Sequence, residues 1–93
     1  MKKLSELMLE GYSMVGKQCF HQYYDGDNPR NPEAVCGEGA SYFAECGNAV
    51  YASPDTERGL RKFEKRVGLR VSDLNDEGMS IPDIAGIAAA EGL

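Results

Sequence analysis

The spacing of glycines constrains this chain most, because it divides the sequence into short helices. Apolar residues recur at helical spacing in four stretches, and each is followed by a glycine: Gly16, Gly47, Gly68 and Gly92. Glycine readily adopts the left-handed backbone conformation that ends an α-helix. We therefore predict a mainly α fold of three to four short helices with a small extended or β-hairpin element.

Apolar periodicity predicts the first two helices. Residues 3–15 form the first, because one helical face would hold Leu4, Leu7, Met8, Tyr12 and Val15. Gly11 lies on that same face, where the missing side chain permits another element to approach closely. Residues 37–46 form the second helix, with an apolar face of Ala40, Phe43 and Ala44.

Local capping signals predict the later helices. Ser53-Pro54 begins one that runs to about Val67, because a serine hydroxyl caps the first amides and proline suits the first helical position. Ser80 begins the last helix, with Asp83 in the acidic position of a capping box. Between these helices, the apolar segment of residues 69–74 is predicted to be extended.

The middle of the chain has no helical period. Residues 18–24 are rich in aromatic and polar side chains, which favours a short extended segment. Residues 25–32 combine glycine, aspartate, asparagine and proline, the residue types of exposed loops. This loop is predicted to be the tip of a small hairpin that leads into residues 34–36.

Length and composition indicate one small domain spanning residues 1–93. No apolar run approaches the roughly 18 residues of a membrane span, and the charged N-terminal stretch is unlike a secretory signal peptide. We therefore expect a cytoplasmic protein, in the host cytoplasm if a phage encodes it. Its three cysteines should stay reduced there.

Two surfaces are candidates for binding a partner. The formal net charge is −5, yet basic side chains gather on one side of the third predicted helix: Arg58, Arg61, Lys62, Lys65 and Arg66. This face suits a charge-complementary protein, and it is also a weak signal for nucleic acid, which the overall acidity disfavours. An aromatic edge in the middle segment comprises Phe20, Tyr23 and Tyr24.

The cysteines and the single histidine suggest chemistry that their spacing does not support. Cys19, His21, Cys36 and Cys46 supply the four ligand types of a closed zinc site. Structural zinc ligands usually come in close pairs, however, and only Cys19 and His21 are close. A Cys36–His21 nucleophilic pair lacks a third orienting group. We therefore predict no cofactor and no enzyme activity, with a zinc-stabilised Cys₃His domain as the alternative.

Two motifs together resemble a family of small uncharacterised bacterial and bacteriophage proteins. Residues 35–41 read Val-Cys-Gly-Glu-Gly-Ala-Ser, similar to the family's Cys-x-x-Gly-Ala-like helix start, and residues 71–76 are similar to its Asn-Asp turn before the last helix. The chain departs from the pattern at Gly37, Glu38 and Leu74. The resemblance implies a fold and a phage or prophage context, not a mechanism. It also implies structural roles for Cys36 at a tight helix start and for Asn75-Asp76 in a turn that caps the final helix.

Taken together, these observations predict a non-enzymatic accessory protein, encoded by a phage or prophage, that acts by binding another protein. The alternatives are the zinc-stabilised domain and a nucleic-acid-binding module that uses the basic helix face. Homodimerisation is also open, because the last helix is rich in alanine and glycine and such helices pack closely. The sequence does not identify the partner or the pathway.

Overall fold

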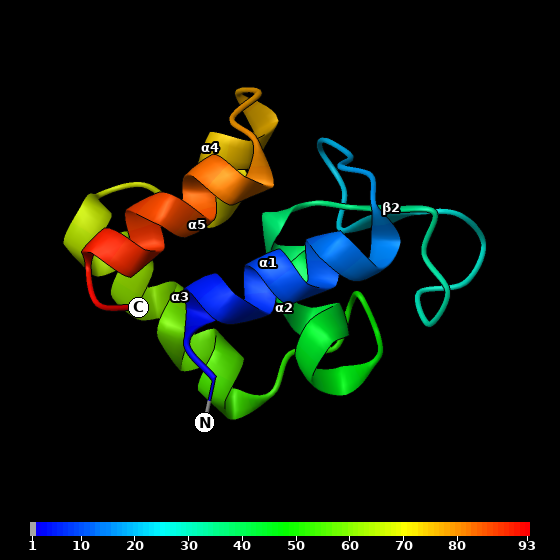
Figure 1. The fold of residues 1–93 in the computed structure, drawn as a ribbon, viewed down its shortest axis with the longest axis horizontal. Coiled ribbons are helices and arrows are strands. Elements are labelled where there is room, and N and C mark those ends of the chain that lie inside the picture. Colours follow the sequence, from blue (N-terminus) through cyan, green and yellow to red (C-terminus); the bar gives the residue numbers. More distant parts are fainter. Residues whose placement is uncertain (1) are drawn as a thin grey trace.

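Helices dominate the structure, a computed structural model that describes residues 2–93 (Figure 1). Their order along the chain, with two short strands, is α1 (Leu4–Val15), β1 (Tyr24–Asp25), β2 (Ala34–Val35), α2 (Gly37–Cys46), α3 (Pro54–Val67), α4 (Val71–Asp76) and α5 (Ile81–Ala90). The predicted fold class, mainly α with a small hairpin, is confirmed. Within the described residues, no helix has both the length and the apolar character needed to cross a membrane.

The predicted helix ends are present with the expected capping chemistry. Ser53 Oγ accepts a hydrogen bond from the Thr56 amide at 3.2 Å, and Ser80 Oγ accepts one from the Asp83 amide at 3.2 Å. The glycines that follow α1, α2 and α3 have left-handed φ angles of 83°, 67° and 86°: Gly16, Gly47 and Gly68. Local sequence signals therefore set most of the helix boundaries.

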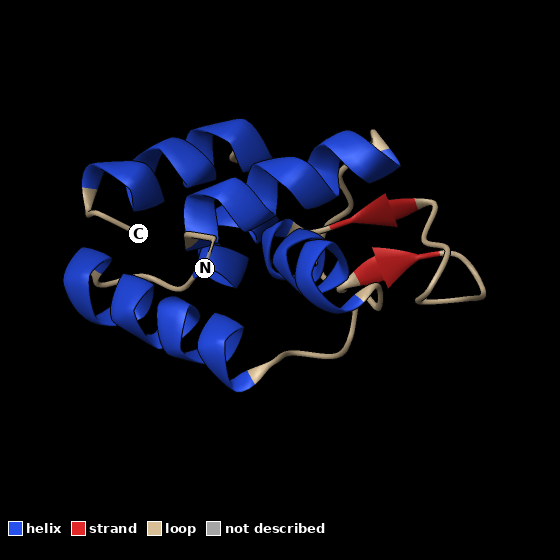
Figure 2. Cartoon of the chain, turned by 60° about the horizontal axis from the view of Figure 1, so that its bottom comes forward, coloured by secondary structure: helices blue, strands red, loops and turns tan. Residues whose placement is uncertain are grey.

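Helix α1 crosses α2 at very short range, and Gly11 makes this approach possible. A Cβ atom built on Gly11 would lie 1.9 Å from the carbonyl oxygen of Ala40, far inside van der Waals contact. Ala40 is fully buried at this crossing. Helix α5 packs against α1 as well, so the first helix lies between the second and the last (Figures 1 and 2).

The main core lies where these helices meet α3 and α4. Its largest fully buried apolar side chains are Phe63, Met8, Ile81, Ile84, Val35 and Val71. They come from α1, β2, α3, α4 and α5, so the core depends on elements from the whole chain. Burying such side chains stabilises a fold by about 1.5–3 kcal/mol each.

The hairpin is part of a slightly larger arrangement in which β2 is central. On one side β2 pairs antiparallel with β1, with Tyr24 opposite Val35. On the other side Gln18 forms a parallel bridge with Val35. Tyr24 and Val35 pack in the main core, whereas Cys19, Ala34 and Cys36 form a second buried cluster. The two faces of this small sheet therefore contribute to different clusters.

One predicted element is wrong: residues 71–76 are helix α4, not an extended segment. The cause is a start signal of unusual composition. An oxygen of the Asp73 carboxylate accepts a hydrogen bond from the Arg70 amide at 3.2 Å, and the same carboxylate binds the Arg70 guanidinium. These bonds hold the pKa of Asp73 below its ordinary value. Val71 and Leu74 then share the buried side of the helix.

Candidate functional site

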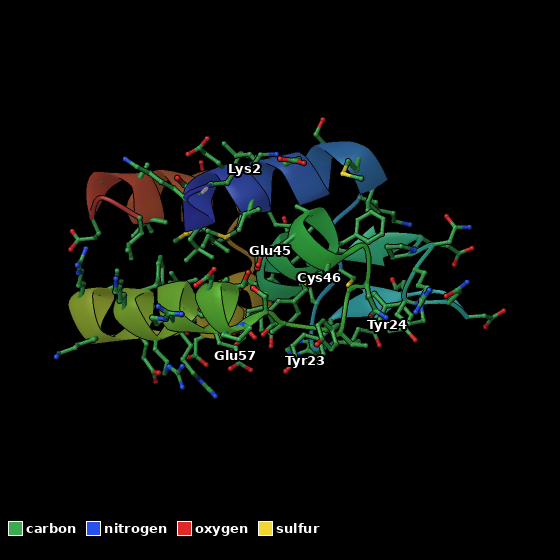
Figure 3. The ribbon with its side chains drawn as sticks, turned by 90° about the horizontal axis from the view of Figure 1, so that it is seen from below. Lys2, Tyr23, Tyr24, Glu45, Cys46 and Glu57 are labelled. Atoms are coloured by element: carbon green, nitrogen blue, oxygen red, sulfur yellow. The ribbon has the colours of Figure 1, made fainter. Side chains whose placement is uncertain are left out.

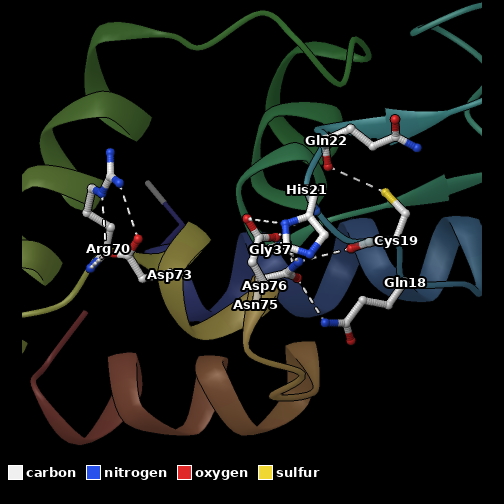
Figure 4. Close-up of polar contacts among 9 residues, drawn as sticks. All are labelled: Gln18, Cys19, His21, Gln22, Gly37, Arg70, Asp73, Asn75 and Asp76. Carbon is white, nitrogen blue, oxygen red and sulfur yellow. Dashed lines mark hydrogen bonds and ion pairs between the residues drawn. The ribbon is translucent and has the colours of Figure 1, made fainter.

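A buried asparagine organises the region with the most polar contacts. Asn75 lies in the last turn of α4 and is fully buried. Its Oδ1 accepts hydrogen bonds from the Gly37 amide at 3.0 Å and from Gln18 Nε2 at 2.8 Å. Its Nδ2 donates to the carbonyl of Cys19 at 2.9 Å and to Asp76 Oδ1 at 3.2 Å (Figure 4). One amide thus connects α4, the first turn of α2 and the segment before β1.

This arrangement corrects the role that the resemblance implied for Asn75-Asp76. Ser80, not Asn75, caps the final helix. Asn75 instead accepts from the first amide of α2, where backbone N–H groups have no partner inside the helix. Gln18 extends the connection to α5, because its Oε1 accepts from the Ile81 amide at 2.9 Å and its Nε2 donates to the Met79 carbonyl at 2.8 Å.

Asp76 fixes a loop of residues 20–23, which we call the aromatic loop. Asp76 Oδ1 accepts a hydrogen bond from the His21 amide at 2.8 Å, and its Oδ2 lies 3.6 Å from His21 Nδ1 (Figure 4). The φ angle of His21 is 65°, the single positive value among the described non-glycine residues. Left-handed backbone costs a residue with a side chain about 1 kcal/mol. The bond to Asp76 offsets this cost and holds the loop in one shape.

The aromatic loop borders a hollow of about 310 Å³, which we call the His21 cleft. Its lining comes from the loop, the start of α2 and α4: His21, Gln22, Tyr23, Cys36, Glu38, Arg70, Ser72 and Asp76. A second hollow of about 300 Å³ shares Glu38 and Arg70 with the first. Its other lining residues are Tyr42, Glu57, Leu60, Arg61, Glu64 and Val71. We call the two adjoining hollows the groove.

Aromatic rings and acidic groups give the groove its chemistry. The rings of Tyr23 and Tyr42 lie 5.8 Å apart at 50°, and one belongs to each hollow. Tyr23 is 47% exposed, so much of its ring is free for contact. In Figure 3, Tyr23 and Glu57 lie along the same edge of the molecule. The groove is lined by four carboxylates, those of Asp76, Glu38, Glu57 and Glu64. Only two guanidinium groups of the described residues, those of Arg70 and Arg61, balance them.

The predicted aromatic edge divides between the surface and the core. Phe20 is 44% exposed and Tyr23 is 47% exposed, and both belong to the aromatic loop. Tyr24 belongs to strand β1, where it is partly buried and packs against the main core. The exposed part of the predicted aromatic edge is therefore formed by Phe20 and Tyr23.

The predicted basic face lies on the exposed side of α3, opposite the buried Phe63. All five of its residues are exposed: Arg58, Arg61, Lys62, Lys65 and Arg66. Arg58 is paired with Asp55 at 2.8 Å, and Arg66 donates to the Glu91 carbonyl at 2.7 Å. Arg61 also lines the groove, so the basic face and the groove meet along α3.

Burial makes the two buried cysteines poor nucleophiles at neutral pH. Burial raises the pKa of Cys36 to about 11 and that of Cys19 to about 12, so both are thiols at neutral pH. Cys36 instead caps α2, its Sγ accepting from the Gly39 amide at 3.3 Å. His21 and Cys36 both line the His21 cleft, but no hydrogen bond joins their side chains among the described residues.

The four residues of the zinc alternative are only partly brought together. Cys19 and Cys36 pack in one cluster, while Cys46 lies at the far end of α2 (Figure 3). His21 points its imidazole toward Asp76 and is largely exposed. Across residues 2–93 the structure contains no group of three or more histidine, cysteine, aspartate or glutamate side chains that could hold a metal ion.

Several residues of the site had no functional signal in the sequence. Gln18 was predicted only as part of an extended segment, and Arg70 and Ser72 were assigned no role. Gln18 joins the site through a hydrogen bond to Met79, 61 residues away, and Arg70 and Ser72 line the His21 cleft together with His21, Gln22 and Tyr23. The resemblance pointed to Asn75 and Asp76, but to a different role.

Comparison with known proteins identified no relative. No family model matches the chain, and neither a curated protein nor a solved structure is significantly similar to it.

Proposed function

We propose that this protein is a non-enzymatic binding module whose groove takes an extended, basic peptide segment of another protein. The observation behind the proposal is the meeting of the two hollows at Glu38 and Arg70, with the Tyr23–Tyr42 pair on the groove wall. A pair of adjoining hollows suits an extended chain better than a compact small molecule. The excess of carboxylates along the groove favours lysine and arginine side chains.

The fixed shape of the aromatic loop supports the proposal. Aromatic side chains contribute strongly to protein interfaces, because they bury a large area and lose little conformational freedom. Asp76 holds the backbone of the loop before any partner arrives. Less ordering is then required on binding, which leaves more of the interaction free energy for affinity.

The resemblance to small phage and bacterial proteins supports a phage or prophage origin for the chain. In that setting the peptide segment would belong to a phage or host protein, and the module would act as an accessory factor. The groove chemistry is independent of this origin, and it can be tested without knowing the partner.

Selection from a display library of random twelve-residue peptides tests the proposal. We expect the selected peptides to be enriched in lysine, arginine and aromatic residues. With one purified selected peptide, fluorescence polarisation should show at least about tenfold weaker binding to Tyr23→Ala, because interface aromatics commonly contribute more than 1.4 kcal/mol. Glu64→Lys should weaken binding by about threefold to tenfold, more strongly at low salt.

Matched controls lie outside the groove. Tyr51→Ala removes a tyrosine that is 63% exposed, and Glu77→Lys reverses an exposed acid. Both variants should bind the selected peptide as the wild type does. Selection that yields no common motif, or equal losses in the groove and control variants, would contradict the proposal.

Nucleic-acid binding is the second candidate, and the exposed basic face of α3 favours it. Lys62 and Lys65 form no ion pair with a described residue and lie outside the groove. If this face binds phosphates, Lys62→Glu with Lys65→Glu should abolish binding to a duplex oligonucleotide, and the wild-type affinity should fall steeply with salt. The same double variant should leave peptide binding in the groove unchanged.

A further inference from the structure

Cys19 and Cys36 lie at matching positions of two paired segments. Gln18 and Val35 form a parallel bridge. Two hydrogen bonds close it: the Cys19 amide donates to the Val35 carbonyl at 2.9 Å, and the Val35 amide donates to the Lys17 carbonyl at 3.0 Å. The next residue on each segment is a cysteine. Matched residues of parallel strands point to the same face of a sheet. Cys19 and Cys36 should therefore face the same side, and they do belong to one buried cluster.

The spacing of such a pair suits a disulfide. Neighbouring strands lie about 4.8 Å apart, and disulfides join residues whose Cα atoms are about 4.4–6.8 Å apart. The backbone of Cys36 is still extended, with φ −86° and ψ 176°, so the strand geometry continues through it. Both side chains are nearly inaccessible, at 5% and 4% exposure, and they pack with Ala34.

We propose that Cys19 and Cys36 are an oxidation site that closes into an intramolecular disulfide when the protein meets a small disulfide such as oxidised glutathione. Cys36 also lines the groove, but the test detects a bond within the chain and requires no bound peptide. The closed bond would join the two ends of the segment that contains the aromatic loop and the hairpin.

The exchange requires no other reactant. Cys36 borders the His21 cleft, so its thiolate is the one that reaches the oxidant. It attacks one sulfur of oxidised glutathione and releases a glutathione thiolate. The Cys19 thiolate then attacks the Cys36 sulfur of the mixed disulfide and releases the second glutathione thiolate. The two protons lost by the protein thiols pass to the two glutathione thiolates, so two thiols and one disulfide yield one disulfide and two thiols.

Cys46 provides an internal control for this reaction. It lies at the opposite end of α2 from Cys36, and the ten-residue helix is about 15 Å long. A disulfide cannot span that distance without unfolding the helix. Oxidised glutathione can attach to Cys46, which is partly exposed, but the attachment forms no bond within the chain.

The experiment treats the folded Cys46→Ser variant with oxidised glutathione and measures the intact mass. We expect the loss of two hydrogen atoms, a peptide that joins Cys19 to Cys36 after digestion, and a melting temperature raised by about 10 °C that a reductant restores. The reaction should accelerate about tenfold per pH unit between about pH 7 and pH 9, because thiolates are the reactive species. Wild-type protein should form the same bond, with or without an adduct on Cys46.

Other outcomes overturn the proposal. Glutathione adducts on Cys19 or Cys36 without a cross-link would mean that the two sulfurs do not meet. Complete alkylation of Cys19 and Cys36 in denaturant after treatment would mean that the folded protein does not react. A disulfide between two chains would mean that Cys19 and Cys36 do not pair within one chain. Cys36→Ser in the Cys46→Ser background should yield no internal disulfide. Peptide mapping of the wild type decides the question if that variant does not fold.

Discussion

Helix α2 is joined to the molecule in two different ways, and the contrast shows how a small fold combines packing with specificity. Against α1 the contact is purely steric: backbone meets backbone at Gly11 and Ala40, with no room for a side chain. Against α4 the packing is also close, and a chemical contact is added to it: Asn75 Oδ1 accepts a hydrogen bond from the amide of Gly37, the first residue of α2. The steric contact sets how closely the helices approach. The chemical contact sets the position of α2 along its axis and the place of the aromatic loop.

The largest expected effect comes from breaking the steric contact. Gly11→Ala places a methyl group 1.9 Å from the Ala40 carbonyl oxygen, which only a shift of one helix can relieve. We expect the free energy of unfolding to fall by at least about 3 kcal/mol, measured by urea denaturation. Gly86→Ala is the matched control. It adds the same methyl group to the interior of α5, where no atom other than the helix's own backbone lies within 4 Å, and should stabilise the protein by about 0.5–1 kcal/mol. Similar values for the two variants would contradict close packing at Gly11.

Breaking the chemical contact should cost somewhat less. Asn75→Ala leaves the Gly37 amide and the Cys19 carbonyl without their partner in a buried region. We expect a loss of about 2–4 kcal/mol in the free energy of unfolding, because each buried group left unpaired costs about 1–3 kcal/mol. Asn48→Ala removes an amide oxygen that accepts only from the exposed Val50 amide, and should cost less than about 1 kcal/mol. If the two variants unfold at the same urea concentration, Asn75 does not stabilise the contact between α2 and α4.

The smallest effect concerns the thiols beside the chemical contact. In the unfolded chain a cysteine loses its proton near pH 9.0, whereas Cys36 retains its proton up to about pH 11 in the folded protein and Cys19 up to about pH 12. Between pH 9 and pH 11 the unfolded state therefore binds fewer protons, and the free energy of unfolding should fall as the pH rises. Cys19→Ala with Cys36→Ala should make this decline shallower in thermal melts under reducing conditions. An unchanged slope would mean that other groups, such as Tyr42, cause all of it.

The elements that the sequence predicted correctly are those set by local signals. Ser53-Pro54 and Ser80 start helices through bonds to amides three residues ahead, and Gly16 ends α1 through its own backbone conformation. Helix α4 escapes prediction because it lacks these local signals. It is too short to show a helical period, and it starts with Arg70 and Asp73 in place of a serine or threonine.

The candidate site was much less accessible from the sequence, because its bonds are long-range. Asn75 bonds residues 38 and 56 positions away, and no local pattern marks such partners. His21 and Cys36 were singled out as reactive residue types, and both do line the cleft. Their proximity follows from the pairing of β2, whereas the acidic character of the groove depends on how α3 and α4 dock. The surface chemistry therefore became visible only with the tertiary structure.

The contact between the first and last helices also affects how the chain folds in time. The amide of Ser5 in α1 donates to the carbonyl of Leu93, and α5 packs along α1. During synthesis α1 emerges first and α5 last, so the core cannot close until the whole described chain has left the ribosome. Contacts between the ends of a chain raise its mean contact separation and slow folding. We therefore expect these helices to complete their core only after α5 has left the ribosome, and more slowly than a bundle of sequential helices.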